Sequence, residues 1–437
     1  MKTSRYTHIS TDAGMQPDEA VIYNTASGNI AAIDQNLLIN GGFDLGKLNS
    51  DQTEWLTALG FLVSDGVEEE AWQRSLFEQA SNDRTVLNLC IAPTYTCNLR
   101  CPYCYEDGHS ENKAFMSKEV IEAIETFVAD YYREYNFNEL NVQWYGGEPL
   151  LAPGVIEELS DFFIGFCEEH HIAYSSMAIS NATRIDKTLA ELLGRCRVSE
   201  IMITIDGDEA EHNKRRPAAD GENSFQAIMG ALEALRECGV NAMPVMNVDK
   251  VNALLFDQVH DELKARFGVE LMPTKLNDYH GSFGSGCFKK GDFELFTFPA
   301  YAKWDVERLA ESDPSREELQ GRFSPFANFC KGQLQNYYCI DAVGDVYNCD
   351  GYMGQPELAL FNLMRDDYRD SQPEIPNPAD NEQCGDCDLL PVCQGNCHWE
   401  RECCGMPCHP FKYVLDDYLR LYRNQFGPRE DAIQLLA

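Results

Sequence analysis

Apolar and polar positions follow two alternating patterns after about residue 85. Short apolar runs, typical of buried strands, alternate with longer segments in which apolar residues recur every three or four positions, as in amphipathic helices. The predicted strands are Val86–Ala92, Leu140–Tyr145, Met177–Ser180, Ile201–Ile205, Val240–Val248 and Val269–Met272. Two helices are predicted most clearly, Lys118–Tyr135 with Ser117 as its cap, and Ala227–Cys238. This alternation is typical of parallel βα units.

The number of these units indicates the fold class. Six βα units are too few for a complete eight-stranded barrel, so we predict an α/β fold built on an open, partial TIM-like βα barrel. In barrels of this kind the chemistry takes place at the C-terminal ends of the strands. The residues that follow the predicted strands are therefore the first candidates for a functional site.

Two flanking segments differ from the barrel pattern. Before it, Glu19–Thr25 and Asn29–Asp34 predict a β-hairpin, and Asp51–Gly60 predicts a short helix, which together indicate a small α+β module. After about Pro325 the chain is rich in cysteines and loops. The predicted domains are the N-terminal module at residues 1–85, the barrel at 86–300 and a cysteine-rich domain at 301–437.

The charge of the chain excludes some partners. Its 437 residues include 71 acidic and 35 basic side chains, which give a net charge of −36. This charge would repel nucleic acid phosphates and anionic membrane surfaces, whereas it would attract a basic peptide. Met1–Gln16 lacks the apolar stretch of an export signal, and no apolar run is long enough to cross a bilayer. We expect a cytoplasmic protein with no nucleic acid or membrane partner.

Three of the eighteen cysteines follow the first predicted strand directly. Cys97, Cys101 and Cys104 have the spacing C-x3-C-x2-C in a loop. Without an export signal, so many cysteines indicate metal or cluster ligation rather than disulfides. Three thiolates can hold three corners of a [4Fe–4S] cluster and leave one iron open for chemistry. A zinc knuckle is disfavoured because zinc would require a fourth ligand close by.

This triplet, with Tyr103 before its third cysteine, resembles the motif of the radical S-adenosylmethionine (SAM) superfamily. The resemblance implies that the open iron binds the amino and carboxylate groups of SAM. One electron then cleaves SAM to methionine and a 5′-deoxyadenosyl radical, while the protein positions the reactants and excludes water. Tyr103 and Tyr105 are expected to lie beside SAM.

Further positions extend the resemblance along the barrel. The run Gly146-Gly147-Glu148 after the second predicted strand resembles the GGE motif, in which the glycines allow close backbone approach and the carboxylate accepts from the SAM ammonium. By the same resemblance Thr204 contacts ribose and Arg216 the SAM carboxylate. Ser180 ends the intervening strand as another polar contact, although the family often has Asn-Gly where this chain has Asn181-Ala182.

The C-terminal cysteines resemble the seven-cysteine SPASM pattern of one branch of this superfamily. The resemblance implies two auxiliary [4Fe–4S] clusters and thus three clusters in all. The first would be held by Cys330, Cys349 and Cys397, and the second by Cys384, Cys387, Cys393 and Cys408. Either Cys339 completes the first auxiliary cluster or that cluster keeps an open iron. Cys403 and Cys404 compete with Cys408, which we prefer because an apolar helical pattern, Phe411–Tyr422, begins just after it.

Two features indicate the substrate. Asp350, next to Cys349, resembles an aspartate of anaerobic sulfatase-maturating enzymes that is a candidate catalytic base, although a loop-capping role fits equally well. The N-terminal module resembles the leader-peptide recognition domain of peptide maturases, which could add a leader strand to its sheet edge. The SPASM resemblance therefore predicts an oxidoreductase that modifies a ribosomally made precursor peptide, giving a thioether or carbon cross-link.

Other functions remain open at this point. A sulfatase maturase that forms formylglycine would explain Asp350, whereas a multi-cluster electron-transfer protein would not need the GGE run or Arg216. A zinc scaffold would be recognised by metal analysis. For the radical enzyme, the resemblance implies reduced flavodoxin or ferredoxin as the electron donor.

Overall fold

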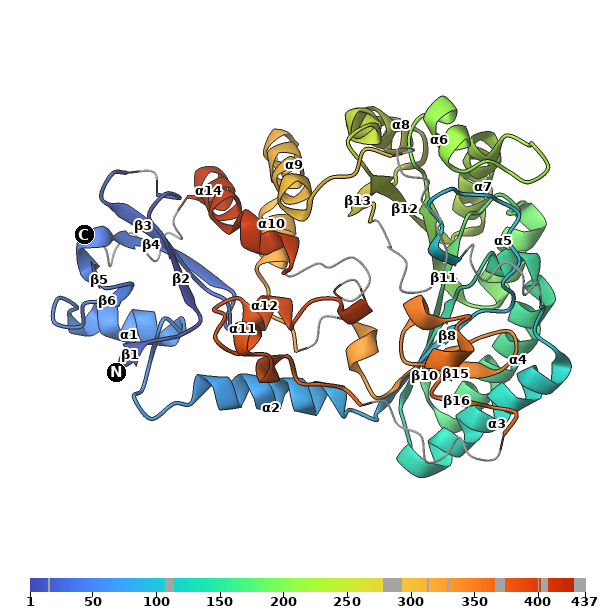
Figure 1. Cartoon of the computed structure of the whole chain (residues 1–437), viewed down its shortest axis with the longest axis horizontal. Coiled ribbons are helices and arrows are strands. Elements are labelled where there is room, and N and C mark those ends of the chain that lie inside the picture. Colours follow the sequence, from blue (N-terminus) through green and yellow to red (C-terminus); the bar gives the residue numbers. More distant parts are fainter. Residues whose placement is uncertain are drawn as a thin grey trace.

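The computed structural model describes most of the chain as a row of three packed parts (Figure 1). The N-terminal module lies at one end, the barrel at the other, and the helices of the C-terminal part lie between them. The described residues are 1–14, 16–106, 114–277, 293–312, 314–327, 330–365, 374–399, 401 and 408–427.

Six parallel strands form the barrel sheet. They are β8 (Val86–Ile91), β9 (Glu139–Trp144), β10 (Ala173–Ser180), β11 (Val198–Thr204), β12 (Asn241–Val248) and β13 (Met272–Lys275). Each strand pairs in parallel with the next along the chain, so the predicted partial barrel is confirmed. The last strand begins three residues later than predicted. The apolar signal there came from Val269 and Leu271, which pack against the core before the edge strand begins.

Amphipathic helices cover the outside of this sheet. They are α3 (Lys118–Tyr135), α4 (Pro153–His170), α5 (Lys187–Arg195), α6 (Glu209–Arg215), α7 (Ser224–Cys238) and α8 (Phe256–Phe267). The predicted α3 has the expected bounds, and the Ser117 side chain accepts from the backbone N–H of Val120 as its cap. The buried apolar stripe of α3 contributes Ile124 and Val128 to the barrel core. In the described part of the chain, no helix has the length and apolarity needed to cross a bilayer.

The C-terminal part adds three short strands to the barrel sheet. They are β14 (Tyr337–Ile340), β15 (Asp345–Tyr347) and β16 (Phe361–Asn362). β14 pairs in parallel with β8, on the side opposite β9, and β15 and β16 continue the sheet in antiparallel fashion. Ile340, Val346 and Phe361 are buried in the same hydrophobic core as the barrel strands. The cysteine-rich part is therefore joined to the barrel through its backbone and its core.

The N-terminal module contains the predicted hairpin and helix. Its elements are β1 (Lys2–Thr3), β2 (Thr7–Ser10), β3 (Glu19–Asn24), β4 (Asn29–Asp34), β5 (Leu38–Ile39), β6 (Gly42–Phe43), β7 (Leu62–Val63), α1 (Ser50–Ala58) and α2 (Glu69–Ser81). Strands β2, β3 and β4 form one antiparallel sheet in that order. α2 leads from this module to the first barrel strand (Figure 1).

The remaining helices join the module to the C-terminal part. They are α9 (Phe298–Glu311), α10 (Arg316–Arg322), α11 (Glu382–Gly385), α12 (Leu390–Cys393) and α14 (Leu415–Phe426). The Tyr23 hydroxyl of β3 donates to the carbonyl of Phe323 at 2.7 Å, and Arg423 of α14 pairs with Glu19 at 2.6 Å.

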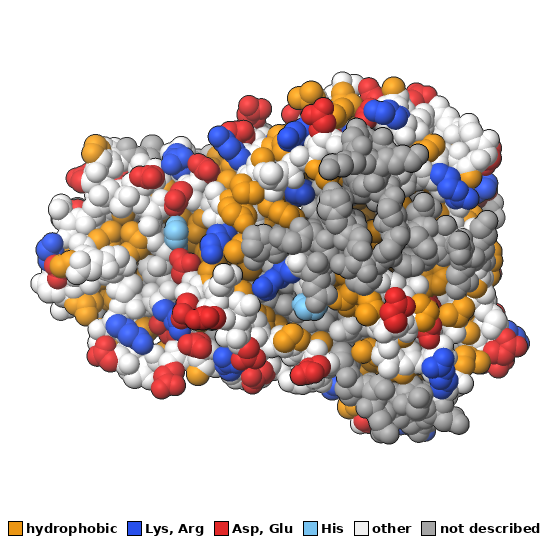
Figure 2. All heavy atoms as spheres, viewed as in Figure 1, with side chains coloured by type: hydrophobic (Ala, Val, Ile, Leu, Met, Phe, Trp, Pro, Cys, Tyr) orange, Lys and Arg blue, Asp and Glu red, His pale blue; other side chains and the backbone are white. Residues whose placement is uncertain are grey.

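Acidic side chains are scattered over the face shown in Figure 2, with basic side chains placed singly among them.

The shared sheet predicts one unfolding event for the barrel and the C-terminal strands. Replacement of the buried Ile340 by alanine removes core contacts and should lower the free energy of unfolding by about 2–5 kcal/mol. The control Val343→Ala, at an exposed position in the following turn, should change it by no more than about 0.5 kcal/mol. Anaerobic denaturant titration followed by circular dichroism measures both. Separate unfolding of the C-terminal strands, with the barrel transition unchanged, would contradict the shared core.

Candidate functional site

A pocket of about 190 Å³ opens at the C-terminal ends of the barrel strands. Loops after β8 and β9 and the last residues of β10, β11, β12 and β13 each contribute to its wall. Its lining includes the predicted site residues Cys97, Cys101, Tyr103, Cys104, Tyr105, Gly146, Gly147, Glu148, Ser180, Thr204 and Arg216. The pocket therefore brings together every residue that the sequence assigned to the first cluster and SAM.

The three cysteines of the triplet are partly buried. Burial raises the pKa of Cys97 to about 12 and that of Cys104 well above its ordinary value. A thiolate here needs a positive partner, which the iron of a cluster would supply. The Asn181 side-chain nitrogen lies 3.7 Å from the Cys97 sulfur, and the Leu99 N–H donates to it at 3.4 Å. Among the described residues, no group of three or more His, Cys, Asp or Glu is arranged to hold a single metal ion.

The two glycines of the GGE run are required by the neighbouring loop. A Cβ on Gly146, whose φ is +104°, would lie 2.6 Å from the carbonyl oxygen of Thr94. A Cβ on Gly147 would lie 2.3 Å from the carbonyl oxygen of Tyr95. Both glycines therefore let the loop after β9 pack directly on the backbone that leads into the cysteine triplet. The sequence predicted glycine at these positions because a ligand approaches the backbone there. The close packing of the two loops is a second reason for glycine.

Glu148 connects the ends of β9 and β10. Its buried carboxylate accepts hydrogen bonds from Leu150 N–H at 3.0 Å, the Ser180 hydroxyl at 2.8 Å and Asn181 N–H at 2.7 Å. Burial raises the pKa of Glu148 despite these donors. Ser180 is thus placed beside Glu148 at the pocket wall. Ala182, two residues after Ser180, has φ +58°, a left-handed conformation that glycine adopts more easily.

Arg216 carries the charge that suits an anionic ligand. It is 8% exposed, and one guanidinium nitrogen donates to the Tyr103 hydroxyl, which in turn donates to Asp206. Among the described residues, no acceptor bonds to the buried Nε of Arg216. A carboxylate in the pocket could satisfy this donor, so the donor set fits SAM. Thr204, at the end of β11, lines the same pocket and is partly exposed to it.

Comparisons with known proteins agree with this geometry. A family model described as the radical SAM superfamily matches residues 91–255, which include the triplet, the GGE run and Arg216. An uncharacterised protein of Methanocaldococcus jannaschii is 32% identical over 63% of this chain and 88% of its own length. The chain belongs to the radical SAM superfamily. This radical SAM protein is therefore an enzyme that uses a [4Fe–4S] cluster and SAM.

Other similar proteins point to one branch of radical SAM enzymes. A serine-type anaerobic sulfatase-maturating enzyme of Bacteroides thetaiotaomicron is 24% identical over 75% of this chain and 86% of its own length. The fold is similar to that of anSMEcpe with bound AdoMet and a peptide, with a TM-score of 0.58, 19% identity and coverage of 78% of this chain and 99% of that one. It is also similar to Streptococcus suis SuiB bound to precursor peptide SuiA, with a TM-score of 0.51, 14% identity and coverage of 94% and 98%. The predicted resemblance to anaerobic sulfatase-maturating enzymes and peptide maturases is confirmed.

The SPASM-type cysteines of this radical SAM enzyme form two groups. Cys330 and Cys397 lie close enough to Cys349 for their charges to raise its pKa, after the larger effect of burial. The other four line a separate pocket of about 420 Å³; they are Cys384, Cys387, Cys393 and Cys408. This grouping matches the two ligand sets that the resemblance implied. Cys403 and Cys404 lie outside the described residues.

Cys339 has a different environment from these ligand candidates. It lies within β14, is fully buried and pairs with Cys90 of β8 in the strand register. Both cysteines belong to one hydrophobic cluster with Tyr337 and Tyr347. Burial raises the pKa of Cys339 well above its ordinary value, and the nearby Cys349 adds to this effect. Ligation by Cys339 stays a prediction.

Aromatic side chains connect the pocket to the segment that follows Cys397. Cys330, Cys349 and Cys397 together are called the first auxiliary group below. The centroids of the Tyr105 and Trp399 rings lie 5.1 Å apart. The Tyr105 hydroxyl contacts the Tyr145 hydroxyl. Glu106 lines the pocket beside Tyr105, and burial together with the charge of Asp350 raises the pKa of Glu106 to about 8. Sequence reasoning missed Glu106 and Trp399, although each lies two residues after a predicted cysteine ligand.

The glycine contacts lead to a test of the pocket wall. Gly147→Ala would force the Tyr95 backbone to shift, so we expect loss of more than about 1 kcal/mol of stability and poor iron retention after reconstitution. The control Gly154→Ala, in the first turn of α4 with nothing within 4 Å of the added Cβ, should keep full iron content. Iron analysis and thermal unfolding under argon compare the two. Full iron content in Gly147→Ala would show that the loop has room to adjust.

Proposed function

We propose that this radical SAM enzyme modifies a ribosomally made precursor peptide and carries three [4Fe–4S] clusters. In this proposal the cysteine triplet holds the SAM cluster, and the two C-terminal groups hold the auxiliary clusters. Residues 1–85 recognise the peptide, 86–300 form the radical SAM barrel and 301–437 form the auxiliary-cluster domain. The product is a thioether or carbon cross-link. The enzyme works in the cytoplasm, with reduced flavodoxin or ferredoxin as its electron donor.

The observation that carries the proposal is the contact between the SAM pocket and the first auxiliary group. Trp399, two residues after Cys397, reaches Tyr105 on the pocket side. Its indole also packs on Gly351, where an added Cβ would come within 2.7 Å of the ring. Asp350 precedes this glycine and follows Cys349. A substrate residue held here would face the SAM pocket and a candidate base together.

The residues of the chain have separate tasks in this reaction. The cluster and SAM, when bound, supply a 5′-deoxyadenosyl radical that abstracts a hydrogen atom from the substrate. Arg216 and Thr204 bind SAM, while Glu148 fixes the loop that orients it. Asp350 takes up the proton that is released when the new bond forms, and the electron released in the same step would pass to an auxiliary cluster held by the C-terminal cysteines. Tyr105 and Trp399 exclude water from the space between them.

The N-terminal module supports a peptide substrate. In the described sheet, β2 is directed toward the C-terminal part, where His8 contacts Asp388 at 3.1 Å and Asp416 at 3.2 Å. β4 forms the other edge of this sheet. An extended leader segment could add there through backbone hydrogen bonds. The SuiB structure contains precursor peptide SuiA, and the anSMEcpe structure contains a peptide, which supports the same substrate class.

A second candidate is formation of formylglycine in a sulfatase. Asp350 beside Cys349 favours it, as does the similarity to relatives named anaerobic sulfatase-maturating enzymes. The N-terminal module favours the precursor peptide instead. An electron-transfer protein without SAM chemistry would not explain why the buried Arg216 Nε has no hydrogen-bond partner among the described residues.

Anaerobic reconstitution tests the cluster count. The full chain should bind about twelve irons, because each of three clusters holds four, and should form 5′-deoxyadenosine from SAM with dithionite. Iron and sulfide analysis with chromatography of the nucleoside measures both. About four irons with active cleavage would refute the auxiliary clusters, whereas bound zinc without cleavage would indicate a scaffold.

Two cysteine variants separate the cluster roles. Cys101→Ala should abolish 5′-deoxyadenosine formation, because the triplet loses a ligand of the catalytic cluster. Cys387→Ala should keep part of the uncoupled cleavage but yield little modified peptide. Mass spectrometry of candidate precursor peptides, together with nucleoside analysis, provides the measurement. Full peptide modification by either variant would overturn the assignment.

A further inference from the structure

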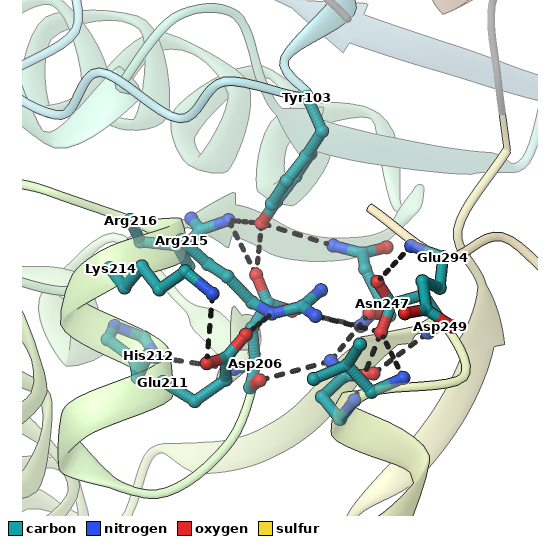
Figure 3. Close-up of polar contacts among 12 residues, drawn as sticks. Tyr103, Asp206, Glu211, His212, Lys214, Arg215, Arg216, Asn247, Asp249 and Glu294 are labelled. Carbon is teal, nitrogen blue, oxygen red and sulfur yellow. Dashed lines mark hydrogen bonds and ion pairs between the residues drawn. The ribbon is translucent and has the colours of Figure 1, made fainter. Parts of the chain in front are cut away.

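Three buried polar residues, Tyr103, Asp206 and Arg216, meet the partly buried Asn247 beside the SAM pocket (Figure 3). Asp206 follows β11, Arg216 follows α6, Tyr103 lies within the cysteine loop and Asn247 lies in β12. Arg216 donates to the Tyr103 hydroxyl, and that hydroxyl donates to one carboxylate oxygen of Asp206. The network thus joins the cysteine loop to two strands of the barrel.

Asp206 is fixed on all sides. Its other carboxylate oxygen accepts from the Asn247 N–H at 3.0 Å. Its backbone N–H donates to Nδ1 of His212 at 3.2 Å, and its carbonyl accepts from the Asn252 side chain at 3.0 Å. His212 can accept here because burial lowers its pKa to about 3, which keeps the ring neutral. Hydrogen bonds to its backbone and to both carboxylate oxygens therefore orient the fully buried Asp206 side chain.

The two sides of the Arg216 guanidinium have different environments. One terminal nitrogen is 3.9 Å from the Asp206 carboxylate and bonds to the Tyr103 hydroxyl. The Nε has no partner among the described residues, and the side chain lines the pocket. Asp206 and Tyr103 therefore hold one side of the guanidinium, and the other side stays available to a ligand.

We propose that Asp206 is a positioning residue for SAM, acting through Tyr103 and Arg216. It sets the orientation of the Arg216 guanidinium before SAM arrives, so that the SAM carboxylate meets a preformed donor. Preorganisation of this kind raises affinity because less side-chain freedom is lost on binding. The inference rests on membership of the radical SAM superfamily and is independent of the proposed peptide substrate.

The neighbouring ion pair provides a matched control. Arg215 bonds to Asp249 at 2.8 Å and to Glu211 at 2.6 Å, and both Arg215 and Asp249 are buried. Asp249 also accepts from the N–H groups of Val251 and Asn252, so it shapes the turn after β12. The residues that line the SAM pocket do not include Arg215 or Asp249. Adjacent arginines thus pair with two buried carboxylates, but only Arg216 of the two arginines lines the pocket, with the Tyr103 that joins it to Asp206.

The test compares SAM binding to reconstituted full-length variants without reductant. Asp206→Asn leaves one acceptor oxygen for two donors, the Tyr103 hydroxyl and the Asn247 N–H, and removes the negative charge beside Arg216, so the network that holds Arg216 is broken. We expect the Kd for SAM to rise about tenfold to a hundredfold, the range for loss of hydrogen bonds to a charged group. Asp249→Asn should lower stability but leave this Kd within about twofold. Anaerobic equilibrium dialysis with labelled SAM measures the Kd, and iron analysis checks that the cluster is present.

A second variant tests the route of the effect. Tyr103→Phe keeps the ring but removes the bridging hydroxyl, so it should weaken SAM binding in the same direction. The double variant Tyr103→Phe/Asp206→Asn should bind SAM no more weakly than Asp206→Asn, because both changes break one connection. Additive effects would overturn the proposal. Unchanged SAM binding by Asp206→Asn would overturn it as well, since the carboxylate would then have no part in positioning. Tighter binding would do the same, because the carboxylate would then act by repelling the ligand. Loss of iron in both single variants would show that the network only shapes the cysteine loop.

Discussion

The parallel order of six barrel strands is the constraint on which the site depends. Parallel strands end at one edge of a sheet, so residues separated by more than a hundred positions meet around a single pocket. The cysteine loop follows β8, the GGE run follows β9, and Arg216 lies beyond β11. Each loop is held by its neighbours: Gly147 packs on the backbone before the triplet, and Glu148 bonds to the end of β10.

Local patterns allowed prediction of the elements and residues whose signal lies within a short stretch of sequence. The apolar stripe of α3 predicts residues that pack in the barrel core, whereas the cysteine triplet and the GGE run predict residues that line the pocket. Asp206 could not be assigned a role in this way, because its partners Tyr103 and Asn247 are distant in the chain. The short strand β14 was missed because four residues carry too little periodicity, and its partner β8 is remote.

The C-terminal part has two kinds of connection to the rest of the enzyme. Its cysteines form groups that fit clusters, whereas Ile340 and Val346 belong to the barrel core. Cys339 lies where these two roles meet, because it is a core residue of β14 that is also near Cys349. The contact between Trp399 and Tyr105 then sets the spacing between the SAM pocket and the first auxiliary group.

The pairing of β14 with β8 also has a consequence for biosynthesis. Cys90 and its register partner Cys339 are roughly 250 residues apart, so the ribosome exposes one edge of β8 long before its partner emerges. At about 5–20 residues per second, that edge waits for roughly 10–50 seconds. An unpaired strand edge is a template for aggregation. Slower synthesis of residues 92–336 lengthens the time for which this edge of β8 is unpaired, whereas pairing with β14 ends the exposure.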